Sequence, residues 1–221
     1  MNSISTDNEG LIDKVLTKEE RDKLTPDEVV KQLQEGNARF VAGDVTIRNH
    51  KKQIRKAAGG QSPKAIILSC VDSRVPVEDV FDKGIGDLFV TRVAGNFINR
   101  YVLGSMEFAC HVAGAKLVVI MGHEHCGAVK SAIDRVELGN ITSMLSHITP
   151  AVDEVIKEGH AGEHTSANQE FVHAVSERNV RIGIQRARDE SEVLRKMEEE
   201  GSLAIVGALY DLDTGEVRFL D

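Results

Sequence analysis

The sequence lacks the features that mark membrane, secreted and disulfide-linked proteins. No apolar run approaches the roughly 20 residues that cross a bilayer, and residues 1–11 contain no apolar signal segment. The cysteines, Cys70, Cys110 and Cys126, are an odd number in a long chain, which argues against a disulfide framework and favours metal binding or a reactive thiol. We therefore expect a cytoplasmic protein with no membrane partner.

Positive charge is also in short supply. The 27 Lys and Arg residues are outnumbered by 35 Asp and Glu residues, which gives a net charge of −8. A chain with this balance is no natural partner for a polyanion, so nucleic-acid binding is not expected. The 221 residues and the hydrophobic fraction of 41% suffice for one substantial domain with a generous core.

Short apolar runs alternate with helical patterns along the chain. The runs are rich in branched residues and bounded by turn residues, which is typical of strands buried in a parallel sheet. Strands are expected at 65–68, 88–92, 117–121, 203–209 and 217–220. The alternation predicts an α/β fold with a mostly parallel central sheet flanked by helices. The last two strands are expected to form a hairpin, which makes the C-terminal strand an antiparallel edge strand.

The helical patterns carry their own start and stop signals. Thr25-Pro26-Asp27-Glu28 combines a capping threonine, a proline at the first helical position and a glutamate that completes a capping box. Helices are expected at 25–41, 75–81, 97–113, 125–136, 141–156 and 170–197, the last with a break near residue 189. Residues 1–16 show no strong periodicity and are expected to form a mobile or partner-dependent tail.

Side chains that bind soft metals follow two of the expected strands. Cys70 comes just after the strand at 65–68, and His123 and Cys126 follow the strand at 117–121. The carboxyl ends of parallel strands meet at one edge of a sheet, where α/β folds place their ligands. His123 and Cys126 are three residues apart at the start of an expected helix, where positions i and i+3 share a face. Two thiolates and one imidazole suit zinc.

The number of ligands indicates the type of zinc site. A structural site normally has four protein ligands, whereas a catalytic site keeps one position for water. Cys110 falls within an apolar helical pattern and is expected to be a buried free thiol. Glu124 and His125 are expected to point away from His123. Three ligands therefore predict catalytic zinc.

Asp72 and Arg74 are candidates for control of the fourth position. Cys70, Asp72 and Arg74 alternate, so an extended backbone would project all three to one side. Arg74 would hold the Asp72 carboxylate through a two-pronged, charge-assisted bond. Asp72 would then orient a zinc-bound water that the metal makes nucleophilic near neutral pH. Because two thiolates weaken the ion as an acid, we expect a mildly alkaline pH optimum.

Together, the motifs Cys70-x-Asp72-x-Arg74 and Gly122-His123-x-x-Cys126-Gly127 resemble those of the β-class carbonic anhydrases, over roughly residues 25–220. The resemblance implies a Zn²⁺ enzyme that hydrates carbon dioxide reversibly to bicarbonate and a proton. It assigns the zinc to the two cysteines and the histidine, and catalysis to the Asp/Arg pair. It also implies a substrate pocket that contains Gln61, Phe89, Phe108 and the backbone N–H of Gly127.

The family also implies an assembly and two possible regulatory features. Its members are dimers or tetramers, which suggests an N-terminal helical arm, 1–60, that packs on a neighbouring subunit, and a catalytic core, 61–221. Phe108 falls where plant-like members place a tyrosine across the dimer interface. In members that close at low pH the aspartate becomes the fourth zinc ligand, a role open to Asp72. A bicarbonate trap found in some members needs a tryptophan, which this chain lacks, although Arg92 and Tyr210 match its other residues and Ile67 takes the tryptophan's place.

Several alternatives stay open from the sequence. The same residues would serve a hydrolase of another small cumulated substrate, or a non-catalytic interaction protein stabilised by zinc. A cysteine-nucleophile enzyme would react through Cys70, but no histidine accompanies Cys70 in its own motif. The glycines at 84–86 are too few for a dinucleotide fingerprint. Candidate proton shuttles are His50, His125 and His164.

Overall fold

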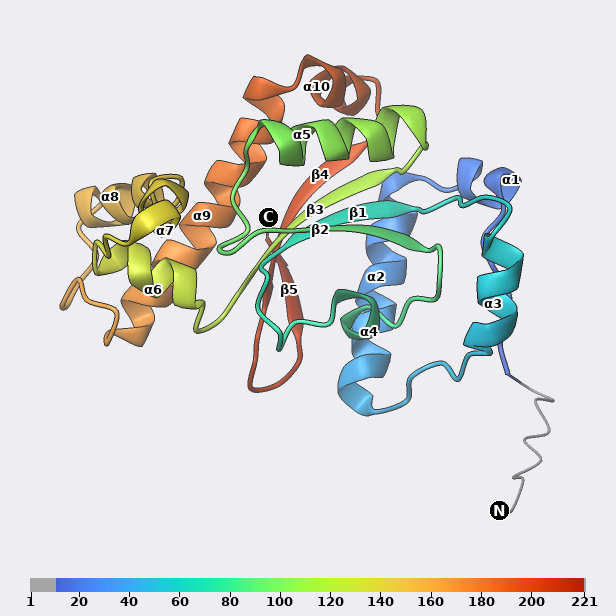
Figure 1. Ribbon diagram of the computed structural model, residues 1–221, viewed down its shortest axis with the longest axis horizontal. Coiled ribbons are helices and arrows are strands. Elements are labelled where there is room, and N and C mark those ends of the chain that lie inside the picture. Colours follow the sequence, from blue (N-terminus) through green and yellow to red (C-terminus); the bar gives the residue numbers. More distant parts are fainter. Residues whose placement is uncertain (1–10, 221) are drawn as a thin grey trace.

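The computed structural model describes residues 11–220, and Figure 1 shows a twisted five-stranded sheet between layers of helices. The strands are β1 (Ala65–Ser69), β2 (Leu88–Arg92), β3 (Leu117–His123), β4 (Ala204–Tyr210) and β5 (Val217–Leu220). They lie in the order β2-β1-β3-β4-β5, and every neighbouring pair is parallel except β4 and β5. The α/β sheet and its antiparallel C-terminal edge strand are therefore confirmed.

The central strands β1 and β3 are buried along their whole length. Their side chains alternate between the two faces, and both faces are covered by helices, so the strands are apolar at every position rather than at every second one. The two strands run in parallel register from Ala65 opposite Leu117 to Leu68 opposite Ile120. Cys70 and His123 therefore emerge at the same edge of the sheet.

The helices divide into two layers and a lobe (Figure 1). One layer contains α2 (Pro26–Ala42) and α4 (Val77–Val80); the other contains α5 (Arg100–Glu107), α9 (Gln169–Glu190) and α10 (Glu192–Glu199). The lobe contains α6 (Gly127–Ile133), α7 (Gly139–Leu145) and α8 (Thr149–Lys157), packed on the first half of α9. Within residues 11–220 no helix has the length and hydrophobicity needed to cross a membrane.

Four helix predictions were wrong in their extent. The helix expected at 75–81 covers only Val77–Val80, which is α4. The helix expected at 97–113 begins only at Arg100, because the Asn99 side chain caps it, and it ends in a π-helical segment, η1 (Phe108–Val112). The region 141–156 is divided between α7 and α8, and the helix expected from residue 125 begins at Gly127. The expected break near residue 189 is confirmed, since α9 ends at Glu190 and Ser191 caps α10.

The N-terminal part of the chain packs on its own core. Both halves of the Thr25–Glu28 capping box are present at the start of α2, and the α2 residues Val29 and Leu33 are completely buried against the sheet. The two short helices nearby are α1 (Lys18–Asp22) and α3 (His50–Ala57). Whether residues of this arm also contact a neighbouring subunit stays a prediction.

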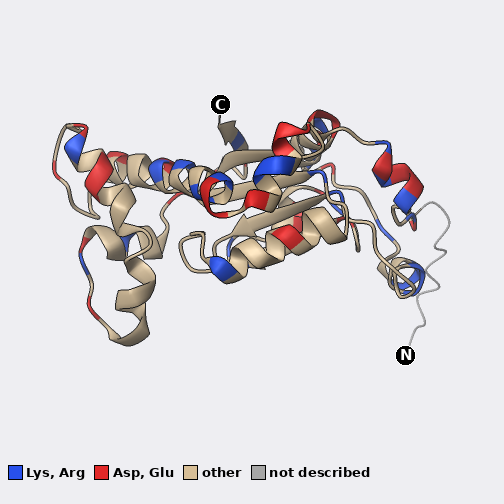
Figure 2. Cartoon of the chain, turned by 90° about the horizontal axis from the view of Figure 1, so that it is seen from above, with Lys and Arg blue, Asp and Glu red and all other residues tan. Residues whose placement is uncertain are grey.

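The prediction that residues 1–16 form a mobile or partner-dependent tail was wrong for residues 11–16, which bond to the rest of the chain. Ile12 bonds through its N–H to the carbonyl of Ile47 and through its carbonyl to the N–H of Asn49, at 3.0 and 2.8 Å. The Gln53 side chain donates to the Lys14 carbonyl at 2.9 Å. Residues 1–10 of the expected tail lie outside the described residues. In the cartoon of Figure 2, segments coloured for acidic and for basic residues alternate along the outer helices, whereas the sheet is mostly tan.

Candidate metal centre

The side chains of Cys70, His123 and Cys126 converge at the carboxyl edge of β1 and β3. All three are buried, and their ligand atoms lie within 4.8 Å of one another; the two sulfurs are 4.0 Å apart. The His123 Nδ1 lies 2.8 Å from the Glu124 carbonyl oxygen, which only accepts, so this nitrogen carries the proton. The Nε2 of His123 is the lone-pair nitrogen of the neutral ring, and it is buried with no hydrogen-bond partner among the described residues.

This donor set fits a zinc ion. Buried polar atoms normally have a hydrogen-bond partner, but His123 Nε2 has none among the described residues. A cation bound between Nε2 and the sulfurs of Cys70 and Cys126 would provide the missing partner. Two sulfurs and one imidazole nitrogen are typical zinc ligands. Cys110 is not a fourth ligand, because it lies in η1, inside the core on the α5 side of the sheet, where burial raises the pKa of its thiol to about 12.

The backbone brings His123 and Cys126 together differently from the prediction. His123 is the last residue of β3, and the Glu124 N–H still bonds the Tyr210 carbonyl of the neighbouring strand, so no helix starts there. His125 then turns the chain with a φ of +54°, and Cys126 becomes the N-cap of α6. The prediction that His123 and Cys126 share a helix face was therefore wrong. A tight strand-to-helix turn brings their side chains together instead.

Asp72 and Arg74 form the expected two-pronged contact beside this cluster. Arg74 donates from Nε to Oδ1 at 3.0 Å and from Nη2 to Oδ2 at 2.8 Å, and its backbone N–H also donates to Oδ1 at 2.9 Å. β1 ends at Ser69, so these residues lie in a turn, and the extended backbone predicted for them was wrong. Asp72 Oδ2 lies 3.9 Å from His123 Nε2.

The protein groups alone set unequal pKa values in the site. The hydrogen bond from Cys126 lowers the pKa of the Cys70 thiol to about 4, while the same contact and burial raise the pKa of Cys126. Among the protein groups alone, the Cys70 thiol is therefore easier to ionise than the Cys126 thiol. The hydrogen bonds from Arg74 hold the pKa of Asp72 well below its usual range.

Sequence reasoning missed the groups that hold the loop around Cys70. Arg92, considered only for a bicarbonate trap, donates to the carbonyls of Cys70 and Asp72 at 2.8 and 2.5 Å. The backbone N–H of Gly95 donates to Cys70 Sγ at 3.2 Å. A turn signal at Gly95-Asn96 was visible in the sequence, but nothing there connects it to Cys70.

The expected substrate-pocket residues are not gathered at the cluster within one chain. Gln61 is exposed and lines a hollow with residues 13–18. Phe89 and Phe108 contact each other edge to face, with centroids 6.3 Å apart, in a hollow over β2 and α5. Gly127 adjoins Cys126 at the start of α6, and the space where its side chain would stand is open.

The candidate shuttle histidines are also dispersed. His125 lies between two of the clustered residues, and its Nδ1 is 2.8 Å from Gln169 Oε1. His50 begins α3, and His164 stacks on Phe171. The position of His125 is the nearest in the chain to the cluster, but the choice among the three stays open.

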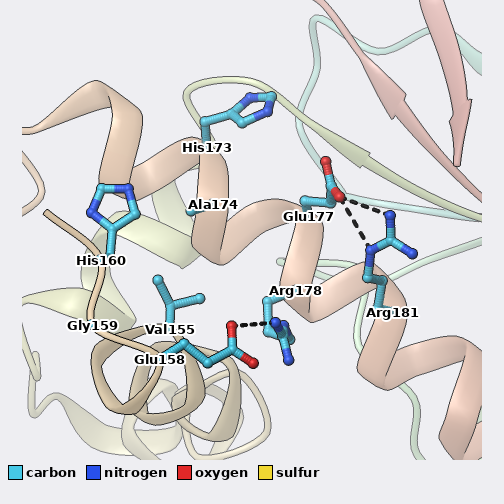
Figure 3. A pocket seen from close by; sticks show the side chains of 9 residues that line it. All are labelled: Val155, Glu158, Gly159, His160, His173, Ala174, Glu177, Arg178 and Arg181. Atoms are coloured by element: carbon cyan, nitrogen blue, oxygen red, sulfur yellow. Dashed lines mark hydrogen bonds and ion pairs between the residues drawn. The ribbon is translucent and has the colours of Figure 1, made fainter.

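A third hollow, of about 370 Å³, lies between α8 and α9 (Figure 3). Arg178 pairs there with Glu158 at 2.5 Å, and Arg181 with Glu177 at 2.9 Å. The opposite charges that line the hollow are therefore paired with each other, and we assign it no ligand.

Comparison with known proteins places this architecture in a family. A family model described as carbonic anhydrase matches residues 65–217. A solved β-carbonic anhydrase of Aspergillus fumigatus superposes with a TM-score of 0.69 at 27% identity, over 88% of this chain and 90% of that one. The chain belongs to the β-class carbonic anhydrases. As a carbonic anhydrase it is an enzyme, which sets aside the non-catalytic alternative.

Relatives of the carbonic anhydrase family cover most of the chain. Carbonic anhydrase 2 of Mycobacterium tuberculosis is 36% identical over 192 residues, which is 86% of this chain and 91% of the relative. The carbonic anhydrase of Mycolicibacterium smegmatis is 35% identical over 197 residues, 85% of this chain and 90% of the relative. A chain from the crystal structures of two tetrameric β-carbonic anhydrases of Sordaria macrospora shares the fold, with a TM-score of 0.69 at 23% identity over 88% of this chain and 97% of that one.

Proposed function

We propose that the chain is a zinc-dependent enzyme that hydrates carbon dioxide reversibly to bicarbonate and a proton. The observation that carries the proposal is the buried, orphaned Nε2 of His123 beside the sulfurs of Cys70 and Cys126. Family membership supports the same chemistry. When bound, the zinc would lower the pKa of a water molecule so that a nucleophile is available near neutral pH.

The chain's own residues would orient the reactants. Asp72 stays ionised, since Arg74 lowers its pKa, and an ionised carboxylate only accepts hydrogen bonds. It would therefore fix the direction of an attacking O–H group. The N–H of Gly127 is at the start of α6, where backbone donors lack partners within the helix, and it would bind an oxygen of the substrate in the open space beside it.

The two side-chain hydrogen bonds from Arg74 to Asp72 support an open zinc site, in which water rather than Asp72 takes the fourth position. With both carboxylate oxygens bonded to Arg74 at 2.8 to 3.0 Å, Asp72 is not available as a fourth zinc ligand. Closure at low pH, in which Asp72 would leave Arg74 and take the fourth position, is the alternative that this contact opposes.

A second copy of the chain would complete the substrate pocket. Phe108, Tyr101 and Val112 lie at the α5 and η1 surface beside the edge strand β2, with 55%, 70% and 68% of their surface exposed. Large apolar side chains exposed together mark a contact surface. We infer that two copies meet at this surface, as at least a homodimer, and that each brings its Gln61, Phe89 and Phe108 toward the partner's metal centre.

Metal content and hydration kinetics test the central proposal. Purified protein is expected to contain one zinc per chain and to hydrate carbon dioxide in a stopped-flow assay with a pH indicator. Cys126→Ser should lose both zinc and activity. Cys110→Ser is the matched control, because this equally buried cysteine is outside the cluster, and it should keep both. Full activity in metal-free protein, or in Cys126→Ser, would refute the proposal.

A further inference from the structure

The Cys70 sulfur receives its backbone hydrogen bond from the loop that follows β2. The Gly95 N–H donates to Cys70 Sγ at 3.2 Å, and Cys70 is only 4% exposed, so water does not compete for the sulfur. A hydrogen bond to a thiolate ligand withdraws charge from the sulfur and so weakens its donation to a metal. The orientation of this one N–H therefore bears on the metal centre.

The orientation of the Gly95 N–H depends on a particular turn. The Asn96 N–H bonds to the Val93 carbonyl at 2.9 Å, and Gly95 has a φ of +81°. These two features are typical of a type II turn with glycine as its third residue. In the commoner type I turn the central peptide is flipped, and the Gly95 N–H would then point away from Cys70.

Asn179 of α9 holds this turn from the other side. Its side chain is 3% exposed, and its Nδ2 donates to the Gly95 carbonyl at 2.8 Å. Ile148 closes the remaining space, because a Cβ atom built on Gly95 would lie 2.3 Å from its Cδ1 atom. Both polar groups of Gly95 are thus fixed, the N–H by Cys70 and the carbonyl by Asn179.

We propose that Asn179 is a positioning residue of the metal centre, which acts through Gly95 to maintain the N–H···S bond to Cys70. The inference rests on the proposed metal site. Two thiolate ligands would donate much charge to a zinc ion and weaken it as an acid. By withdrawing charge from one sulfur, the Gly95 N–H offsets part of that donation, and Asn179 keeps the bond in place.

Cadmium-113 NMR tests the hydrogen bond in the unaltered protein. In ¹⁵N-labelled protein loaded with ¹¹³Cd, the metal is expected to correlate with the Gly95 amide proton through the Cys70 sulfur. A ¹¹³Cd signal that correlates with cysteine protons but not with Gly95 would overturn this inference and leave the metal site standing. Failure of the metal to correlate with any cysteine proton would overturn the metal site itself.

The variant Asn179→Leu tests the role of the side chain. It keeps the size but removes the donor, so the Gly95 correlation should be lost. In cobalt-substituted protein the sulfur-to-cobalt charge-transfer band should move to longer wavelength, because a thiolate without its hydrogen bond is easier to oxidise. Asn179→Asp, which replaces the donor with an acceptor, should give the same shift and serves if the leucine variant does not fold.

Ser176→Ala is the matched control on the same helix. It removes a buried hydrogen bond, from Ser176 Oγ to the Val172 carbonyl at 2.9 Å, which has no connection to Gly95. Its cobalt band and its Gly95 correlation should match those of the unaltered protein. An unchanged band in both Asn179 variants, or an equal shift in the serine variant, would show that Asn179 is only a structural residue.

Discussion

At the scale of the residue, position rather than residue type separates the three cysteines. Cys70 and Cys126 share a buried hydrogen bond at the edge of the sheet, which lowers the pKa of Cys70 to about 4. Cys110 lies among apolar side chains, where burial alone raises the pKa of its thiol. The pKa values of Cys70 and Cys110 therefore shift in opposite directions, because hydrogen bonds to Cys70 outweigh its burial whereas burial alone acts on Cys110.

The forked geometry of Arg74 gives a prediction at this scale. Arg74→Lys keeps the positive charge but removes the two parallel bonds to Asp72. We expect kcat/KM for carbon dioxide hydration to fall by about 10- to 100-fold, as for other groups that orient a metal site, with zinc content unchanged. Arg186→Lys, in a surface pair with Glu190, is the control and should keep full activity. Equal activity in all three proteins would show that the fork has no catalytic role.

At the scale of the element, helix α2 packs against the end of α4 through close backbone contact. Gly36 faces the end of α4 so closely that a Cβ atom there would lie 1.9 Å from the Phe81 carbonyl oxygen. Glycine inside a helix usually costs stability relative to alanine. Here the lack of a side chain is what permits the helix to pack.

The substitution Gly36→Ala should therefore destabilise the protein, against the helix propensity of alanine. We expect the free energy of unfolding to fall by about 3 kcal/mol, because a backbone carbonyl cannot move aside as a side chain would, and Tm to fall by roughly 10 °C. Calorimetry gives both values. Glu35→Ala, the exposed neighbour on the same helix, should change the free energy by less than about 0.5 kcal/mol. A stabilised Gly36→Ala protein would contradict this packing.

Asp82 ties the segment after α2 to the core by charge. Its carboxylate has no exposed surface and accepts hydrogen bonds from Arg48, Thr46 and Arg39 at 2.5 to 2.7 Å. Burial raises its pKa, but these three donors outweigh burial and lower the pKa from 3.8 to about 2. Since the folded state has the lower pKa, the stabilisation is complete above about pH 4 and disappears as the pH falls toward 2.

Urea unfolding between pH 2 and pH 5 measures this contribution. The unaltered protein should lose about 2 kcal/mol more stability over that range than Asp82→Asn, which has no carboxylate to protonate. Asparagine tolerates the positive φ of +46° at this position, so backbone strain does not enter the comparison. Parallel pH curves for the two proteins would show that the Asp82 network contributes nothing.

At the scale of the whole molecule, one chain brings together the three metal-capable side chains, but the residues expected to form the substrate pocket lie apart from them. Gln61, Phe89 and Phe108 line hollows that do not include Cys70, His123 or Cys126. The exposed aromatic residues beside β2 are the ones a second copy would cover. The enzyme is therefore expected to depend on its assembly.

A charge placed on that surface should separate the copies. Phe108→Glu is expected to give monomers in sedimentation velocity, with zinc content retained and hydration activity reduced at least about 10-fold, since charged groups are excluded from interface cores. Leu138→Glu is the control, because Leu138 is similarly exposed, at 64%, but lies in the lobe of α6 to α8. Its assembly and activity should be unchanged. A monomeric Phe108→Glu protein with full activity would show that one chain suffices.

The sequence by itself determined the sheet, the positions of its strands to within two residues and the three metal-capable side chains. Strands 88–92 and 217–220 and the Thr25 capping box lie where predicted, because an apolar run between turn residues and a capping box are signals carried by neighbouring residues. The position of Cys70, His123 and Cys126 at one edge follows from the parallel order of the strands. That order is itself a consequence of the strand–helix alternation.

The tertiary structure alone decided how those side chains are held. The turn at His125, the clamp of Arg92 and the link from Asn179 through Gly95 to Cys70 depend on contacts between residues far apart in the chain. Such contacts leave no local pattern, since a buried asparagine on a helix has the same sequence signal whether or not its amide meets a carbonyl. Side-chain chemistry is local, whereas the orientation that gives it a role is set by packing.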